Sequence, residues 1–389
     1  MPPAAQNSRS VFVPVVALQF SSSQADECRD FLSDRAAHTE CVPVVDENQL
    51  LMSAAGTLSE NGYRFNSIGF DALAKILSAG LLLMFNELAG ETRHSSNSED
   101  RPVDIPAAVG IYNTALRVRF DAIRERTLLV NHAEQAIEGF LGLDHRMLEN
   151  TAFFDMIRAE LESAQPQAQF FRAEIIGREL RVFYIDPTVK LSNVGPNGQH
   201  FFAPGWYFSN REDGGYAAKA TLCLFTRFGP AIESATKVSK LIHMGSDILG
   251  RASVMVRKAA SRTIDMAALA AQIEKLSNSN LGATDDKTDF NAALQRCSEY
   301  LHKLKIPNSL ALELARNALL VGCDAKPKDL IDVYTESALK RRNLFDLVCA
   351  MTRFARNEYA TYRDLLQTSA MRLLLPDLDN EYLRRKHGK

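Results

Sequence analysis

The spacing of apolar and polar residues along the chain predicts a sheet-forming first half and a helical second half. Short runs rich in β-branched and aromatic residues, some of them alternating with polar positions, predict extended strands. The predicted strands cover residues 11–20, 41–45, 115–120, 127–131, 169–176, 179–185, 201–208 and 216–228. The pair Gly177-Arg178 separates two of these runs and is typical of a tight β-hairpin turn.

Helical spacing of apolar residues appears in three early segments and dominates after Ser234. The early helices are predicted over residues 26–34, 68–77 and 150–164. For the second of these, Ser67 is the predicted N-cap and Gly80 the predicted stop. Residues 290–375 predict three or four further amphipathic helices.

The order of these elements predicts an α+β fold, in which a strand-rich central sheet domain is followed by a helical C-terminal region. Polar segments at residues 93–106 and 278–289 have the composition of linkers. We therefore expect a small acidic α/β region over 1–100, a strand-rich body ending in a long basic helix over 107–277, and a helical region over 288–389.

The composition is that of an ordinary globular protein, with 389 residues, 46% hydrophobic and 24% charged. The net charge of −2 gives the whole chain no electrostatic reason to bind nucleic acid. The charge is unevenly spread, however: residues 1–100 hold six basic and 13 acidic residues, whereas residues 237–262 hold six basic residues and one acidic residue. Any nucleic-acid site must therefore be a local patch.

Cysteine spacing and apolar run lengths bear on cofactors and location. The six cysteines lie far apart without a C-x-x-C pair, so neither a four-cysteine zinc site nor a disulfide framework is expected. The most apolar run, residues 76–85, is too short to span a bilayer, and no secretory signal is visible. We expect a cytoplasmic protein with no metal, no cofactor and no membrane contact.

No sequence motif assigns a catalytic residue. Gly245 and Gly250 have the spacing of a phosphate-binding loop, but Arg251-Ala252 follows where such loops need Lys-Ser or Lys-Thr. The chain contains neither G-x-S-x-G nor H-E-x-x-H. The sequence thus favours a protein that is not an enzyme, and a hydrolase using His243 is only a third hypothesis.

The basic segment offers the clearest candidate site. Arg251, Lys258 and Arg262 fall on one stripe of the predicted helix, and Lys237 and Lys240 precede it. Such a stripe can follow the phosphates of a nucleic acid. It can equally be a solvated face that balances the acidic N-terminal region. A second basic cluster lies nearer the C-terminus, at Lys340, Arg341, Arg342, Arg353, Arg356, Arg363 and Arg372.

Aromatic residues are densest before the basic segment, at Phe201, Phe202, Trp206, Tyr207, Phe208 and Tyr216. Lys219 and Arg227 stand close to them in sequence, so the sheet could stack bases as sheet-based single-strand binders do. The alternative interpretation is that these rings form the core of a strand-rich domain.

The segment from Phe202 to Gly215 resembles the phage/plasmid-like proteins catalogued as domain of unknown function 932. The run Ser209-Asn210-Arg211-Glu212 stands at that family's Asn-Ser-Glu turn, and His243-Met244-Gly245 at its His-x-Gly before a long helix. Asn150 and Ala350-Met351-Thr352 match two further family segments. After Arg227, Pro230 and Ala231 depart from the cysteine and asparagine of the family pattern.

This resemblance implies a mobile-element setting but carries no chemistry. Our first hypothesis is a nucleic-acid-binding accessory protein of a phage or plasmid, acting on single-stranded DNA in replication or recombination. The expected contacts are Lys219, Arg227, Lys237, Lys240, His243, Arg251, Lys258 and Arg262, with Arg227 and His243 lining the same groove as the basic helix. The alternative is a self-assembling, homo-oligomeric or host-interaction protein without a nucleic-acid role.

Overall fold

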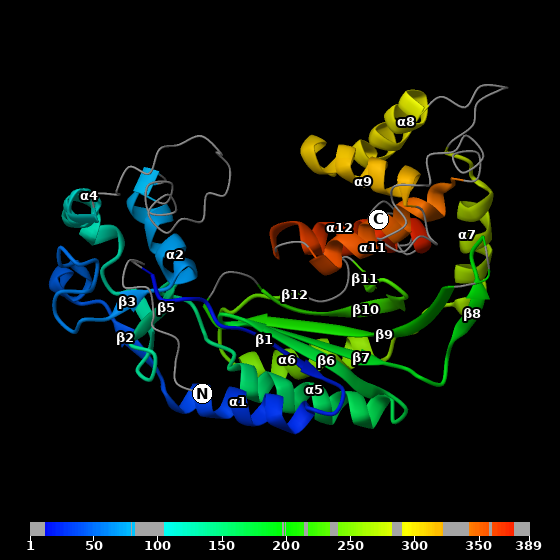
Figure 1. The fold of residues 1–389 in the computed structure, drawn as a ribbon. Coiled ribbons are helices and arrows are strands. Elements are labelled where there is room, and N and C mark those ends of the chain that lie inside the picture. The colour runs from blue at the N-terminus through cyan, green and yellow to red at the C-terminus, as the bar shows by residue number, and fades with distance from the viewer. Residues whose placement is uncertain are drawn as a thin grey trace, which may run out of the picture.

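The computed structural model describes residues 12–78, 80–81, 105–196, 198, 200–213, 217–233, 240–281, 290–321, 342–357 and 360–376. Its centre is an eight-stranded antiparallel sheet (Figure 1). The strand order is β1-β6-β7-β9-β10-β11, with β8 paired to β9 and β12 paired to β10. The strands are β1 (Ala17–Ser21), β6 (Gln169–Ile176), β7 (Glu179–Ile185), β8 (Leu191–Val194), β9 (His200–Arg211), β10 (Ala218–Thr226), β11 (Pro230–Ile232) and β12 (Lys240–Leu241).

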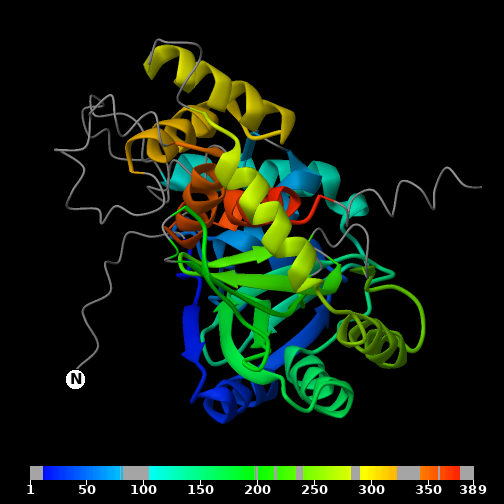
Figure 2. The same cartoon turned by 90° about the vertical axis from the view of Figure 1, so that its right-hand side faces the viewer.

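Helices cover both faces of this sheet (Figure 1). One face carries α1 (Ala25–Ala37), α5 (Asn150–Ala164) and α6 (Ile248–Ala260). The opposite face carries α11 (Leu344–Asn357) and α12 (Ala360–Leu374), with α8 (Phe290–Lys303) and α9 (Asn308–Leu320) stacked beyond them. Helix α7 (Met266–Asn278) crosses the end of the sheet between the two helical layers, as Figure 2 shows.

A smaller four-stranded sheet lies beside the large one, with strand order β2-β4-β5-β3. Its strands are β2 (Thr39–Pro43), β3 (Arg64–Phe65), β4 (Thr127–Asn131) and β5 (Ala136–Leu141). Its helical elements are η1 (Glu47–Leu50), α2 (Ser67–Leu77), α4 (Ile105–Arg119) and η2 (Phe120–Ala122). A separate apolar core fills the space between this sheet and its helices.

The predicted α+β class is confirmed, as is the order of a large sheet followed by helices. The hairpin prediction is also confirmed: β6 and β7 pair antiparallel on either side of Gly177, which has the positive φ of 58° that glycine tolerates best. Helix α2 ends at its predicted residue but starts one residue earlier than predicted. Asn66 rather than Ser67 is the N-cap, because the Asn66 side chain accepts a hydrogen bond from the Gly69 N–H.

The predicted strand over 115–120 is wrong, because these residues end helix α4 and enter η2. The alternation of Leu116 and Val118 with arginines suggested a strand, yet Leu116 is fully buried while Val118 is 77% exposed. The buried positions Val109, Tyr112 and Leu116 instead follow the helical period, and their packing on the small core decides the conformation.

Both sheets draw on residues from either side of the boundary expected near residue 100. Strand β1 pairs with β6 and so belongs to the large sheet. Strand β2 pairs with β4 across the same boundary. The first hundred residues are thus divided between the two sheets. Most of the linker expected at 93–106, and residues 282–289 of the second one, lie outside the described residues.

Candidate anion-binding site

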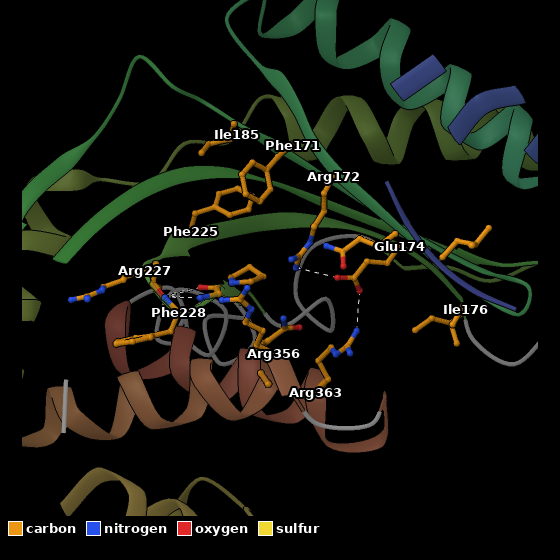
Figure 3. Close-up of a pocket in the computed structure, with 18 of the residues that line it drawn as sticks. Phe171, Arg172, Glu174, Ile176, Ile185, Phe225, Arg227, Phe228, Arg356 and Arg363 are labelled. Carbon is orange, nitrogen blue, oxygen red and sulfur yellow. Dashed lines mark hydrogen bonds and ion pairs between the residues drawn. The ribbon is translucent and has the colours of Figure 1, made fainter. Parts of the chain in front are cut away.

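The basic residues expected to form one site lie on different faces of the large sheet. Arg251 and Lys258 are exposed on α6, on the side that also carries α1 and α5. Lys219, by contrast, forms an ion pair of 3.2 Å with Asp364 of α12 on the opposite face. Arg227 follows β10 and lies on that same opposite face (Figure 3). The structure therefore corrects the expectation of one shared groove, because the sheet separates α6 from Arg227.

The other three lysine and arginine residues of the expected set are placed elsewhere or lie outside the described residues. Arg262 forms a two-pronged ion pair with the buried Glu233, with distances of 2.5 and 2.7 Å. Its guanidinium therefore already has an anionic partner. Lys240 begins β12. Lys237 lies outside the described residues.

His243 is buried rather than groove-lining, with only 4% of its surface exposed. Its ring centroid lies 5.1 Å from that of His145. The pKa of His243 is lowered to about 4, chiefly by burial and also by the neighbouring His145 and Arg251, while Asp213 acts in the opposite direction. His243 is thus a neutral interior side chain at neutral pH, and a phosphate contact does not fit it.

Most of the aromatic cluster is core, as the second interpretation of the sequence held. Phe202, Trp206, Tyr207 and Phe208 are each at most 3% exposed. Phe201 differs, because its ring is 37% exposed and lies under the ammonium group of Lys190, 5.2 Å from the ring centroid. Tyr216 lies outside the described residues. Within this aromatic cluster, base stacking could therefore use Phe201 but not Trp206.

A cavity of about 610 Å³ opens between the sheet and the helices α11 and α12 (Figure 3). Strands β1 and β6, the β10–β11 turn and the two helices contribute its walls. Among the described residues, four arginines and a single carboxylate line it, which gives this part of the lining a formal charge of +3. We call it the arginine pocket and define it by Arg172, Glu174, Arg227, Arg356 and Arg363 together with its aromatic wall.

A β-bulge turns two neighbouring side chains of β6 into the arginine pocket. The register with β7 shifts between Phe170 and Arg172, so Phe171 is the extra residue. Phe170 packs against the core below the sheet, whereas Phe171 and Arg172 both line the pocket above it. Strict alternation could not place Phe171 and Arg172 on the same face. The bulge thus puts an aromatic ring beside a guanidinium.

The floor of the pocket is an ion-pair triad around Glu174. Arg172 of the same strand approaches one carboxylate oxygen of Glu174 at 3.2 Å, and Arg363 of α12 approaches the other at 2.9 Å. Burial lowers the pKa of Arg172, and the neighbouring Arg363 and Arg356 act in the same direction against Glu174. One carboxylate therefore faces more positive charge than it can neutralise.

The rim of the pocket adds two exposed cations. Arg356 and Arg227 are both exposed, and they reach the cavity from α11 and from the β10–β11 turn. Among the described residues, no carboxylate forms an ion pair with Arg356. Arg353, one turn before Arg356 on α11, lies over the ring of Phe228 with its guanidinium carbon 4.5 Å from the ring centroid. The positive charge thus extends from the floor to the rim.

Aromatic rings form the wall opposite the floor triad. The ring centroids of Phe171 and Phe225 lie 4.5 Å apart, and the ring of Phe171 is 38% exposed (Figure 3). Phe201 and Phe228 also line the pocket. Exposed rings beside guanidinium groups can bind a ligand that is both planar and anionic.

The sequence signals missed most of this site. Arg353, Arg356 and Arg363 belong to the second basic cluster that their spacing had marked, but nothing placed that cluster against the sheet. Arg172 and Glu174 lie in a correctly predicted strand, and no linear pattern distinguishes them from a solvated strand face. Of the residues expected to bind nucleic acid, only Arg227 lines the pocket.

A second polar cluster joins the two sheets. Arg178 follows the turn glycine and is 2% exposed. Its guanidinium binds Glu138 of β5, Glu212 after β9 at 3.1 Å, and the Thr39 hydroxyl of β2 at 2.6 Å. Arg35 of α1 also binds Glu138. Two buried arginines and two buried glutamates thus balance at the junction, which fits a structural role.

Residues that carry the family resemblance converge at this junction. The Asn210 side chain donates to the Asn150 side-chain oxygen at 2.8 Å and to the Leu148 carbonyl at 2.6 Å. The carboxylate of Glu212 accepts from the Asn150 backbone N–H at 2.6 Å, at the start of α5. The motif residues therefore fix the beginning of α5 and hold it against the end of β9.

Comparison with known protein families, with curated proteins and with solved structures finds no match to this chain. The resemblance to domain of unknown function 932 therefore stays a prediction. Within the described ranges, no helix has the length and apolar character needed to cross a bilayer. The same residues contain no group of three or more histidine, cysteine, aspartate or glutamate side chains arranged to hold a metal ion.

Proposed function

We propose that this protein binds single-stranded nucleic acid in the arginine pocket. The observation that carries the proposal is a cavity of about 610 Å³ whose described lining residues have a formal charge of +3 and include the exposed Phe171. Guanidinium groups supply salt-dependent contacts to phosphates, and aromatic rings supply stacking surfaces for bases. Few other ligands combine a repeating negative charge with planar rings.

Two features favour a single strand over a duplex. Stacking on Phe171 or Phe201 requires bases that are free of their partners, whereas a duplex offers side chains mainly its phosphates and groove edges. Lys190 and Arg353 lie outside the pocket lining but pack on Phe201 and Phe228 of its wall, so the pairing of cations with aromatic rings continues outward. The binding surface thus extends past one nucleotide toward β8 and α11.

The cellular role that we propose is an accessory function in DNA replication or recombination of a phage or plasmid. The mobile-element setting comes from the sequence resemblance alone. The cytoplasm suits such a role, and the five described cysteines are all free thiols, which is typical of a reducing compartment.

Fluorescence anisotropy of a labelled single-stranded oligonucleotide at 50 and 200 mM salt tests this function. We expect binding that weakens steeply with salt, and weaker binding to a duplex of the same length. Comparison of DNA and RNA strands of the same sequence identifies the preferred sugar. Absence of binding at 50 mM salt, or binding without a salt dependence, would overturn the proposal.

A second candidate function is protein interaction through α4. Ile111 and Val118 on this helix are 55% and 77% exposed, and they line a groove of about 510 Å³ with Leu77 of α2. Exposed apolar residues of this kind commonly mark interfaces. Size-exclusion chromatography with light scattering, applied to the wild type and to Val118→Lys, tests whether this face mediates self-association. A monomeric wild type excludes self-association through α4.

A further inference from the structure

Two side chains of the arginine pocket, Gln367 and Arg172, each have a buried polar atom without a partner among the described residues, and these atoms define the ligand more closely. Gln367 of α12 lines the pocket and is 3% exposed. Within the described part of the chain, its Oε1 atom has no hydrogen-bond donor, and the Nε atom of Arg172 has no acceptor. A buried acceptor and a buried donor are therefore left unsatisfied in one cavity.

Such atoms cost stability unless a ligand or water satisfies them. A buried polar group without a hydrogen bond is destabilising, and most such groups in folded proteins are paired. A phosphate could accept from Arg172 but has no donor for Gln367 when it is fully ionised. The missing partner of Gln367 must carry an N–H or O–H group.

We propose that the pocket holds one nucleotide of the strand with its base inside and its phosphate at the rim. This inference rests on the proposed function. The edge of a base offers the N–H donor that Gln367 lacks and the ring or carbonyl acceptor that Arg172 lacks. The face of the base stacks on Phe171, and the phosphate meets Arg356.

The dimensions and the position of the groups agree with this ligand. A volume of about 610 Å³ lies within the range of small-molecule sites and suits a single nucleotide. Gln367 lies one helical turn after Arg363 on α12, so both face the same cavity. Phe171 belongs to the sheet, so the base would be enclosed between a ring and a polar helix face.

Competition with small phosphates separates recognition of a base from recognition of charge. A labelled oligonucleotide is bound first, and then AMP or ribose 5-phosphate is added. We expect AMP to displace it at about tenfold lower concentration than ribose 5-phosphate, because only AMP presents a base edge. In Gln367→Leu, AMP and ribose 5-phosphate should compete at similar concentrations. Gln295→Leu on α8 is the matched control and should keep the tenfold difference between them.

The outcomes distinguish failure of the base pocket from failure of nucleic-acid binding itself. If the oligonucleotide binds in a salt-dependent way but AMP and ribose 5-phosphate compete equally, the base pocket is wrong and the proposed function stands. If no oligonucleotide binds, both are overturned. Should Gln367→Leu fail to fold, Phe171→Leu at the exposed ring replaces it, and an unchanged tenfold difference in that variant contradicts the proposal.

Discussion

The Nη1 atom of Arg363 on α12 lies 2.9 Å from a carboxylate oxygen of Glu174 on β6. This ion pair ties the helical layer to the sheet at the floor of the arginine pocket (Figure 3). Because Arg172 shares the same carboxylate at 3.2 Å, Glu174 holds two cations in place. The pocket is therefore built from groups whose charges constrain one another before any ligand arrives.

Glu174→Gln should destabilise the protein, because it leaves two largely buried guanidinium groups without their shared anion. We expect a loss of about 2–4 kcal/mol in the free energy of unfolding. Urea denaturation followed by fluorescence of the buried Trp206 measures it. Glu162→Gln, in an exposed pair with Arg158, is the control and should change stability by less than about 1 kcal/mol. Equal stability of the two variants would contradict the triad.

Added polyanion should restore part of the stability lost in Glu174→Gln. Without the Glu174 carboxylate, Arg172 and Arg363 are expected to bind phosphate groups more strongly. A ligand that binds only the folded state raises the melting temperature. Thermal unfolding with and without oligonucleotide checks this, and the shift should be larger for the variant than for the wild type. A smaller shift in the variant would show that Glu174 helps to bind the ligand.

Arg178→Ala should be among the most destabilising substitutions in the chain. It leaves Glu212 buried without its cation and Glu138 with Arg35 alone, and burial already raises the pKa of Glu212. Loss of one partner of a buried pair costs about 3–5 kcal/mol. Arg158→Ala, which breaks ion pairs of an arginine with a 46% exposed side chain, should cost less than about 1 kcal/mol. If Arg178→Ala and Arg158→Ala unfold at similar urea concentrations, Arg178 does not stabilise the junction of the two sheets.

Stability should fall as pH drops from about 6.5 to about 4, partly because of His243. Its folded pKa of about 4 lies below the ordinary value of 6.5, so the unfolded chain takes up protons first. The stabilising contribution is complete above pH 6.5 and amounts to about 3 kcal/mol. His243→Phe should flatten the stability profile over this range. An identical profile in the variant would show that His243 titrates normally.

The local elements were predictable wherever one residue type or one period determined them. Gly177 marks the β6–β7 turn, and the apolar spacing of α5 appears directly in its buried residues Phe154, Ile157 and Leu161. The segment 115–120 failed because its alternation was accidental and tertiary burial of Leu116 favoured a helix. Local pattern thus succeeded where packing agreed with it.

The arginine pocket could not be predicted in the same way. Its cations come from β6, the β10–β11 turn, α11 and α12, and only the tertiary fold brings them together. The bulge places Phe171 and Arg172 on the same face of the sheet. It thereby interrupts the alternation of side chains between the two faces, on which strand predictions depend. The charge count led instead to α6, because a continuous segment is visible in sequence and a folded cluster is not.

We propose that nucleic acid binds the arginine pocket and not the basic face of α6. The salt dependence of oligonucleotide affinity distinguishes these two surfaces when it is measured in two double variants. The pocket variant carries Arg227→Ala and Arg356→Ala, and the α6 variant carries Arg251→Ala and Lys258→Ala. Loss of the two pocket arginines should weaken binding at least about tenfold and reduce the salt slope by about 1.4, since each phosphate contact on a single strand contributes about 0.7. The α6 pair should bind as the wild type does. If the salt slope of binding falls in the α6 variant and stays unchanged in the pocket variant, binding in the arginine pocket is contradicted.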